Sequence, residues 1–268
     1  MISAVVLTYN EEIIIGKCLE ALNFVDEIIV FDSFSTDNTV AISETKGANV
    51  TQRAFDNYSN QRNEALKSVS KNTSWILMVD ADEIVTSSLK CEILDIIKSN
   101  DAAELYRVRR KDMFQGKWLK YSSGYPTWFP RLFKNGEVQV EREINEEYVT
   151  NGKIGHLNEH LIHYPFNKGL NWWFQKHNRY SDMEAEKMII EHSEILNLRL
   201  LFSNDPVERR KFFKRLSYRV PLRPQLVFFV FFFFRKGFLD GYSGYTFCRM
   251  RKIYETMIDI KFKLKQKQ

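Results

Sequence analysis

The sequence has few residues that break or cross-link a chain. Its 268 residues include 3 Cys, 6 Pro and 11 Gly, and Cys18, Cys91 and Cys248 are widely scattered. This excludes a disulfide mini-protein and a collagen-like repeat, and it indicates a reducing compartment. Because 44% of the residues are hydrophobic and 27% are charged, a disordered chain is also excluded. The length suits one sizeable domain with a buried core and an appendage.

Long hydrophobic runs are also missing from the sequence. A bilayer-spanning helix needs roughly 20 apolar residues, and the longest run, Leu226–Phe234, has nine. The N-terminal stretch MISAVVLTYNEE has no basic region ahead of its apolar residues, and acidic residues end that run at once. We therefore expect a first strand there rather than a signal peptide.

The excess of positive charge is confined to the C-terminal quarter of the chain. Residues 205–268 hold 16 Lys and Arg against 5 Asp and Glu, a charge of +11. The other 204 residues hold 23 against 29, a charge of −6. Such asymmetry indicates an anionic partner, either nucleic acid or an anionic membrane surface.

Strand and helix patterns alternate through the first hundred residues. Apolar runs predict strands at residues 2–8, 27–31, 49–53 and 75–79, and helices are predicted at residues 13–22, 36–46, 57–70 and 87–99. Ser35 is a candidate N-cap for the second helix, and Gly47 is a stop signal after it. Buried strands that alternate with helices predict an α/β fold with a mostly parallel central sheet and flanking helices.

The pattern changes near residue 103. Longer, partly alternating strands are predicted at residues 104–112, 127–133, 137–140 and 154–163, and Asn135-Gly136 is a hairpin turn signal. Helical patterns follow at residues 167–201, 208–218, 225–235 and 245–265. We therefore divide the chain into an α/β domain at residues 1–165 and a helical, basic, Phe-rich region at residues 166–268.

The acidic sequence Asp80-Ala81-Asp82-Glu83 directly follows the predicted strand 75–79. Alternate residues at a strand end point the same way, so both Asp carboxylates can face one ligand. Two carboxylates so placed suit a divalent cation, Mg²⁺ or Mn²⁺, that also holds a diphosphate. The alternative is a solvated acidic turn before a helix, where Asp and Glu interact favourably with the helix dipole.

Two other predicted strands end in polar residues at the same edge of the sheet, where ligands of such folds bind. One runs into Thr8-Tyr9-Asn10-Glu11, and the next into Asp32. A hydroxyl, an aromatic face and a carboxylate can together hold a nucleoside. Neither GxGxxG nor GxxxxGK[ST] occurs in the sequence, which argues against a dinucleotide-dependent oxidoreductase and a P-loop ATPase. A metal on Asp82 is then the simplest means to neutralise phosphates.

The order and spacing of VVLTYNEE, VFDSFSTDNT, QRNEAL and WILMVDADE resemble the inverting glycosyltransferases of family 2, which have a GT-A fold. Further segments resemble the branch with the bacterial glucosyltransferases of the lipopolysaccharide inner core; they are YPTWFPRLFKNG, VEREINEEY, HLIHYPF, NRYSDMEA and FFFRKGFLDGYSG. The resemblance covers most of the chain. It implies that residues 1–165 form a GT-A domain for nucleotide-sugar binding and catalysis.

The resemblance also implies roles for individual residues. The matched positions are Thr8, Tyr9, Glu11 and Asp32 for the nucleotide, Asp80 for the ribose or donor sugar, Asp82 for the metal and Arg62 for the donor. A surface arginine on a helix is an equally good explanation of Arg62.

The catalytic base is implied by the resemblance to lie within residues 142–147. Relatives have Val-His-Glu at the positions of Ile144, Asn145 and Glu146, so we expect Glu146 to take the proton of the attacking hydroxyl. Asn145 departs from that pattern and leaves Glu147 as the alternative. An acidic surface loop is the remaining explanation.

Three more residues are candidates for the site. His163 follows a strand-like run, and a late histidine of the family can reach the metal or the diphosphate; the alternative is a satisfied core histidine. Arg131 could neutralise a phosphate of donor or acceptor, or it could be a solvated strand residue. Trp128 offers a flat face on which an acceptor sugar could stack, although aromatic residues are more often part of a core.

The C-terminal segment alternates cationic stretches with apolar ones. Nine consecutive apolar residues make a poor base-stacking platform, but they fit an interfacial helix whose Lys and Arg meet lipid headgroups at roughly 1 kcal/mol each. We therefore expect a protein that is cytoplasmic and peripheral on the inner membrane, with no nucleic-acid partner. The alternative is a core helix with a solvated basic face.

Together these features predict a metal-dependent inverting glycosyltransferase. The expected donor is a UDP-sugar, with glucose as the sugar, and the expected acceptor is a hydroxyl of the lipopolysaccharide inner core, on a heptose. Another surface polysaccharide or a peptide is the alternative acceptor. Another nucleotide-sugar or nucleotidyl transferase, and a non-enzymatic membrane-binding module, are the alternative functions.

Overall fold

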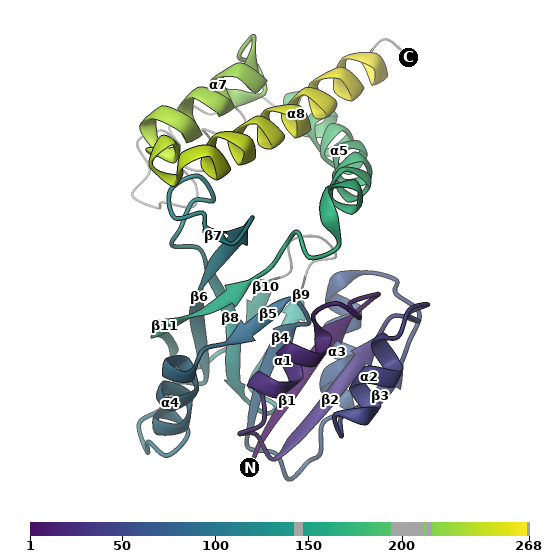
Figure 1. Ribbon diagram of the computed structural model, residues 1–268, viewed down its shortest axis with the longest axis vertical. Coiled ribbons are helices and arrows are strands. Elements are labelled where there is room, and N and C mark those ends of the chain that lie inside the picture. Colours follow the sequence, from purple (N-terminus) through teal and green to yellow (C-terminus); the bar gives the residue numbers. More distant parts are fainter. Residues whose placement is uncertain (142–146, 194–211, 213–215, 267–268) are drawn as a thin grey trace. The chain divides into compact units, whose positions relative to one another are not determined.

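The computed structural model describes the chain except residues 142–146, 194–211, 213–215 and 267–268 (Figure 1). The chain forms two compact units. The first comprises Met1–Trp118 and Tyr125–Lys168, and the second comprises Leu119–Gly124 and Gly169–Gln268. The first unit ends at Lys168, three residues after residue 165, where the sequence places the end of the α/β domain.

The first unit is built on one large sheet. In the part of the chain that the structure describes, the sheet has nine strands. Their spatial order is β3 (Asn49–Gln52), β2 (Glu27–Asp32), β1 (Ile2–Thr8), β4 (Trp75–Asp80), β8 (Trp128–Lys134), β6 (Leu105–Phe114), β11 (Ile154–His163) and β5 (Glu83–Val85), with β7 (Lys117–Trp118) paired to β6.

The sheet is parallel on one side and mixed on the other. Strands β3, β2, β1 and β4 run parallel, whereas β8 is antiparallel to both β4 and β6. The register places Thr8 beside Asp32 and Leu7 beside Asp80, so the carboxyl ends of β2, β1 and β4 meet at one edge. The predicted α/β fold with this strand-end edge is confirmed.

Helices cover both faces of the sheet, because near-continuous apolar strands must be buried on two sides. On one face, Val6 packs in a cluster with Ile15 of α1 (Ile15–Ala21) and Ile93 of α4 (Ser87–Ile96). On the other face, Val5 packs in a cluster with Ala65 of α3 (Tyr58–Lys67). The remaining helix of this unit, α2 (Thr39–Thr45), lies beside α1 (Figure 1).

Two local predictions from the sequence are wrong. Ser35 does not cap α2, which begins after Asn38, because the Ser35 hydroxyl hydrogen-bonds to Asp32 instead. Asn135-Gly136 does form a turn, with Gly136 at φ +83°, but the flanking strands do not pair with each other. Strand β9 (Gln139–Glu141) leaves the main sheet and pairs with β10 (Glu147–Val149), since the edges of β8 are already occupied by β4 and β6.

The second unit is helical. Helix α5 (Gly169–Ser193) packs on α8 (Gly241–Lys265) through a cluster that contains Met188, Ile258 and Phe262. The predicted apolar helix becomes α7 (Arg223–Phe229), followed by a π-helix at Val230–Phe234 and a 3₁₀ turn at Gly237–Asp240. The Asp240 carboxylate accepts hydrogen bonds from three successive backbone N–H groups at residues 120–122, which anchors the 119–124 loop in this unit. None of the described helices has the length and apolar character required to cross a membrane.

Candidate functional site

Asp80 and Asp82 lie at the carboxyl end of β4, where the apolar run WILMV ends. The backbone around them is held on both sides. The N–H of Ala81 donates to the carbonyl of Leu7 (3.1 Å), and the N–H of Tyr164 donates to the carbonyl of Asp82 (2.9 Å). The chain then returns along β5, which places Glu83 beside His163 of β11. This turn gathers charged side chains from β4, β5 and β11 at one edge.

Asp80 is held between two buried arginines. Arg62 of α3 donates from Nη2 to Oδ1 (3.0 Å), and Arg131 of β8 donates from Nη2 to Oδ2 (2.8 Å). Burial alone would raise the pKa of Asp80, but the two arginines outweigh it and hold the pKa well below its usual range. Arg62 is 4% exposed and Arg131 is 3% exposed, so neither is the solvated surface residue that the sequence left possible.

Arg131 is bound still more tightly to Glu83, which is fully buried. Arg131 donates from Nε to Glu83 Oε2 and from Nη2 to Glu83 Oε1, both at 2.8 Å, a bidentate pair. Arg110 of β6 adds a third contact, from Nη1 to Glu83 Oε1 (3.3 Å). Glu83 therefore fixes the position of the arginine that in turn fixes Asp80.

The same set of contacts continues to Asp82. Arg110 Nε donates to Asp112 Oδ1 (3.2 Å), His163 Nδ1 lies 2.7 Å from the same oxygen, and His163 Nε2 lies 3.2 Å from Asp82 Oδ2. Burial alone would lower the pKa of His163, but the two carboxylates raise it to about 9. Burial would raise the pKa of Asp82, and His163 lowers it below the usual value. His163 is therefore more than a core histidine, since both ring nitrogens face carboxylates.

The residues at Asp82 fit a divalent cation that takes further ligands from a substrate. Among the described residues, no group of three or more His, Cys, Asp or Glu side chains could hold a metal ion alone. Asp82 and His163 offer one carboxylate and one imidazole, and Asp112 orients that imidazole as carboxylates do behind metal-binding histidines. Mg²⁺ in particular is commonly bound by one or two carboxylates together with substrate phosphates.

The charges of this cluster also favour a cation. We call these residues the strand-end cluster: His163 with Arg62, Arg110, Arg131, Asp80, Asp82, Glu83 and Asp112. Its three arginines stand against four carboxylates, so it is neutral while His163 is protonated and one unit negative once His163 loses its proton. A divalent cation would reverse that sign and attract a diphosphate.

Asp32 and Thr8 lie side by side at the ends of β2 and β1. The Asp32 carboxylate is fully buried and accepts hydrogen bonds from the Ser35 N–H (2.8 Å), the Ser35 hydroxyl and Gln52 Nε2 (2.9 Å). Thr8 Oγ1 is buried, and no residue in the described ranges hydrogen-bonds to it. A buried hydroxyl without a partner is costly, which points to a ligand as its partner.

Tyr9 and Glu11 are held by Lys168, the last residue of the first unit. The Lys168 ammonium contacts Glu11 Oε1 (2.7 Å) and donates to the carbonyl of Tyr9 (2.6 Å), and Asn167 donates to the other Glu11 oxygen. Burial and the nearby Asp82 raise the pKa of Glu11. The Tyr9 ring is 42% exposed at this edge and could stack on a planar base.

One predicted residue, Trp128, is not brought into this cluster. Trp128 packs at the start of β8 with its ring 4.8 Å from that of His156 and 5.3 Å from the Arg109 guanidinium. Glu146, the predicted base, lies outside the described residues. Glu147, the alternative, is exposed at the start of β10.

Sequence reasoning missed four residues of the cluster: Glu83, Arg110, Asp112 and Lys168. Glu83 belongs to the acidic sequence that had been singled out, but nothing local showed that it would be buried against an arginine. Arg110 and Asp112 alternate along β6, a pattern that marks one face of a strand. Lys168 follows the end of β11 by five residues, and only the fold brings it back to β1.

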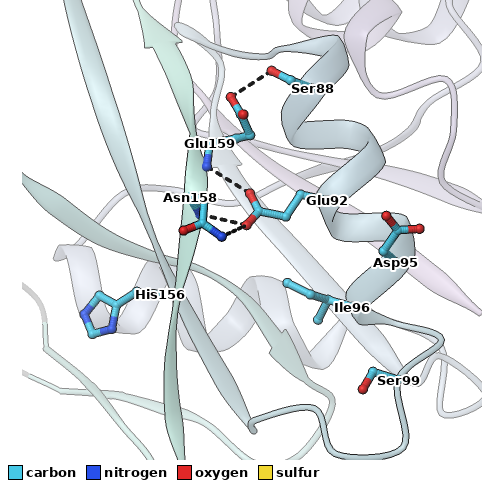
Figure 2. A pocket seen from close by; sticks show the side chains of 8 residues that line it. All are labelled: Ser88, Glu92, Asp95, Ile96, Ser99, His156, Asn158 and Glu159. Carbon is cyan, nitrogen blue, oxygen red and sulfur yellow. Dashed lines mark hydrogen bonds between the residues drawn. The ribbon is translucent and has the colours of Figure 1, made fainter.

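The hollow shown in Figure 2, of about 570 Å³, is lined by none of the charged residues gathered around Asp80 and Asp82. It lies between α4 and the first half of β11. Within it, Glu92 accepts hydrogen bonds from the backbone and side chain of Asn158 and from the N–H of Glu159. These bonds satisfy the irregular stretch of β11 between His156 and His160, so Glu92 has a structural role.

Comparisons with known proteins find a family model and relatives that resemble this chain in sequence. A family model described as glycosyl transferase family 2 matches residues 3–156. An uncharacterized glycosyltransferase of Rickettsia felis is 28% identical, over 97% of this chain and 92% of its own length. The lipopolysaccharide core biosynthesis glycosyltransferase LpsC of Rhizobium meliloti is 24% identical, over 95% of this chain and 92% of its own length.

The crystal structure of S. aureus TarS 1–349 is similar over 100% of this chain and 92% of its own, with 16% identity and a TM-score of 0.46. The family model covers more than half of the chain, including β1, β4 and the strands that carry Arg110 and Arg131. The chain therefore belongs to glycosyl transferase family 2 and is a glycosyltransferase.

Proposed function

We propose that this enzyme transfers a sugar from a UDP-sugar to a hydroxyl of the lipopolysaccharide inner core. Glucose is the proposed donor sugar and a heptose is the proposed acceptor residue. The transfer is a single displacement at the anomeric carbon with inversion. The name of the Rhizobium relative, a lipopolysaccharide core biosynthesis glycosyltransferase, supports the acceptor class.

One observation carries the proposal: Asp80 accepts hydrogen bonds from two arginines, while Asp82 faces a histidine. The Asp80 carboxylate accepts from Arg62 and Arg131, whereas Asp82 Oδ2 lies 3.2 Å from His163 Nε2. This supports different roles for the two aspartates: Asp80 contacts the ribose or donor sugar, and Asp82 binds a cation.

The donor would lie across the ends of β1, β2 and β4. Tyr9 would stack on the base, and Thr8, Glu11 and Asp32 would provide polar contacts to the nucleoside. Arg62 and Arg131 act through Asp80: their guanidinium groups fix the orientation of its carboxylate, so that few rotamers remain to be ordered when the donor binds.

Asp82 Oδ2 and His163 Nε2 would hold Mg²⁺ or Mn²⁺. Bound there, the cation would neutralise negative charge on the leaving diphosphate. His163 must lose its Nε2 proton to become a ligand, and Asp112 keeps the ring oriented by accepting from Nδ1–H.

Glu146 is the proposed general base. It would accept the proton of the acceptor hydroxyl as that oxygen attacks, a task that suits a carboxylate. Glu147 is the alternative in the same segment.

The second unit would bring the enzyme to its glycolipid. We define the aromatic patch as six exposed apolar side chains of α7, the π-helix, the 3₁₀ turn and the start of α8, namely Phe229, Phe233, Phe234, Phe238, Leu239 and Tyr242. Phe234 is 75% exposed and Tyr242 is 72% exposed, and Arg235 and Lys236 lie within the same stretch. An exposed apolar patch with neighbouring cations fits the surface of an anionic membrane. This supports a peripheral position on the cytoplasmic face of the inner membrane.

A panel of UDP-sugars tests the proposal. The full-length enzyme is incubated with each sugar, with Mn²⁺ or Mg²⁺ and with lipopolysaccharide core acceptor, and release of UDP is measured. We expect UDP-glucose to be consumed fastest, and UDP with Mn²⁺ to raise the melting temperature. No turnover of any UDP-sugar, together with no thermal shift by UDP, would contradict the proposal.

A further inference from the structure

Strand β6 carries charged residues on both of its faces. Side chains alternate along a strand, so Arg110 and Asp112, which belong to the cluster around Glu83, point to one face. Arg107, Arg109 and Lys111 alternate with them and point to the other face. The hydrogen bonds and ion pairs described for the strand-end cluster do not involve these three cations.

The neighbouring strands add rings to the face that carries the three cations. Trp128 of β8 pairs with Arg109, and His156 and His160 of β11 pair with Arg107 and Arg109. Paired residues of adjacent strands lie on the same side of a sheet. Figure 2 shows the His156 ring pointing away from α4, which agrees with this placement. The resulting basic–aromatic face comprises Arg107, Arg109, Lys111, Trp128, His156 and His160.

Three side chains of the basic–aromatic face contact one another, and a fourth, Lys111, lies over the Trp118 ring of β7 at 4.5 Å. The Arg109 guanidinium lies 5.3 Å from the Trp128 ring, and the His156 ring meets the same indole edge-on at 4.8 Å. Arg109 Nε is buried and has no hydrogen-bond partner among the described residues. A guanidinium that stacks on an indole while one N–H remains unpaired has capacity for an anionic ligand.

The potential of the face is positive. Burial lowers the pKa of His160, and Lys111 and Arg109 lower it further, although Glu159 acts in the opposite direction. Glu159 Oε2 lies 3.7 Å from His160 Nδ1 and also accepts a hydrogen bond from Ser88. Within the described ranges, three cations thus stand against Glu159, whose carboxylate is shared with α4.

We propose that the basic–aromatic face binds the acceptor as an anionic saccharide, one that carries phosphate or carboxylate groups. Arginines recognise such groups, and an indole offers an apolar surface to a sugar ring. Arg109 precedes Asp112 by three residues, roughly 10 Å at about 3.3 Å per residue, so a saccharide on this face can extend to the strand-end edge. This inference rests on the proposed function, because it names the subsite for the acceptor of that transfer.

Calorimetric titration with a water-soluble lipopolysaccharide core oligosaccharide tests the inference. The oligosaccharide is used intact, after removal of its phosphate groups, and after reduction of its carboxyl groups. The wild-type enzyme is compared with Arg109→Gln, Arg107→Gln and Trp128→Ala. We expect each variant to weaken binding of the intact oligosaccharide about tenfold or more, and loss of the recognised anionic group to weaken wild-type binding similarly.

Lys90→Ala is the matched control. It also removes a cation over an aromatic ring, that of Phe24 at 5.4 Å, but on α4. UDP affinity is measured for every variant and should be unchanged. Equal oligosaccharide affinity of Arg109→Gln, Arg107→Gln and wild type would overturn the inference, even if Trp128→Ala fails to fold. Absence of UDP binding by the wild type would instead count against the proposed function.

Discussion

Two aspartates separated by a single residue have different partners at the end of β4. Asp80 accepts from Arg62 and Arg131, while Asp82 faces His163. The difference arises from residues that are distant in sequence, on α3, β8 and β11. Removing one member of a buried ion pair leaves the other without compensation, so the arginines determine stability as well as the geometry of the site.

Arg131→Gln should destabilise the protein by about 3 kcal/mol or more, because fully buried Glu83 would lose its bidentate partner. Among the described residues it would keep the longer contact with Arg110 and the hydrogen bond from the N–H of Asp80. Urea unfolding followed by circular dichroism measures the change. Lys67→Gln, which breaks the exposed pair with Glu64, is the control and should cost less than about 0.5 kcal/mol. An Arg131→Gln variant as stable as this control would show that the buried pair is not needed for folding.

Glu146→Gln should reduce turnover by roughly 10²- to 10⁴-fold, since the attacking hydroxyl would keep its proton. UDP affinity should be unchanged, because the base contacts the acceptor rather than the nucleotide. Steady-state kinetics and UDP titration separate the two effects. Glu147→Gln is the paired variant, and if it alone loses turnover, the base is one residue later than we propose.

At the scale of elements, the sequence predicts where the strands lie along the chain better than it predicts which strands pair in the sheet. All eight predicted strands coincide with observed ones within about two residues at either end, because apolar runs and alternation are local signals; these are β1, β2, β3, β4, β6, β8, β9 and β11. The strand β5 was missed, since three residues are too few to show a period, and its pairing with β11 is non-local. The turn at Gly136 was found, but not the departure of β9 from the sheet.

The candidate site was predictable to a similar extent. Asp80, Asp82, Asp32 and Thr8 could be found because polar residues directly follow buried strands. The partners of Asp80 could not, because an arginine on α3 and one on β8 reach it only after the sheet has formed. The burial of Glu83 likewise depends on Arg131, which lies 48 residues later.

His177 of α5 should make the protein less stable at low pH. Burial lowers the pKa of His177 to about 4, and its ring stacks on Trp173 with centroids 3.6 Å apart. Between pH 6.5 and about 4 the unfolded chain binds this proton and the folded chain does not, so stability falls as the pH falls through this range. His177→Phe keeps a ring but cannot titrate.

Differential scanning calorimetry at pH 7 and pH 4.5 measures this effect. The melting temperature of His177→Phe should fall less than that of the wild type between the two pH values. An equal fall for both proteins would show that His177 is not a source of the acid sensitivity.

At the scale of the whole molecule, the net charge of +5 separates into an acidic part and a basic part. The carboxylates of the strand-end cluster belong to the acidic part, and the aromatic patch lies in the basic C-terminal region. Each part thus has surface chemistry for a different proposed partner: a nucleotide sugar with its cation, and an anionic membrane.

Phe233→Ser combined with Phe234→Ser should weaken binding to vesicles of phosphatidylglycerol and phosphatidylcholine about tenfold or more, because each exposed Phe would bury its ring in the lipid interface. Vesicle sedimentation measures the bound fraction. Ile260→Ser removes another exposed apolar side chain, from α8 outside the aromatic patch, and should have little effect. Equal partitioning of the double variant and wild type would refute a role of the patch in membrane binding.

The central claim is that Asp82, with His163, holds a divalent cation that the UDP-sugar shares. Calorimetric titration of UDP with and without Mn²⁺ tests it in wild type, in Asp82→Asn and in the exposed control Asp95→Asn. We predict that Mn²⁺ strengthens UDP binding by wild type and by the control, and that Asp82→Asn loses this dependence while it remains folded. The account would be contradicted if the wild type bound UDP equally tightly with and without Mn²⁺. It would also be contradicted if Mn²⁺ strengthened UDP binding by Asp82→Asn as much as it does for the wild type.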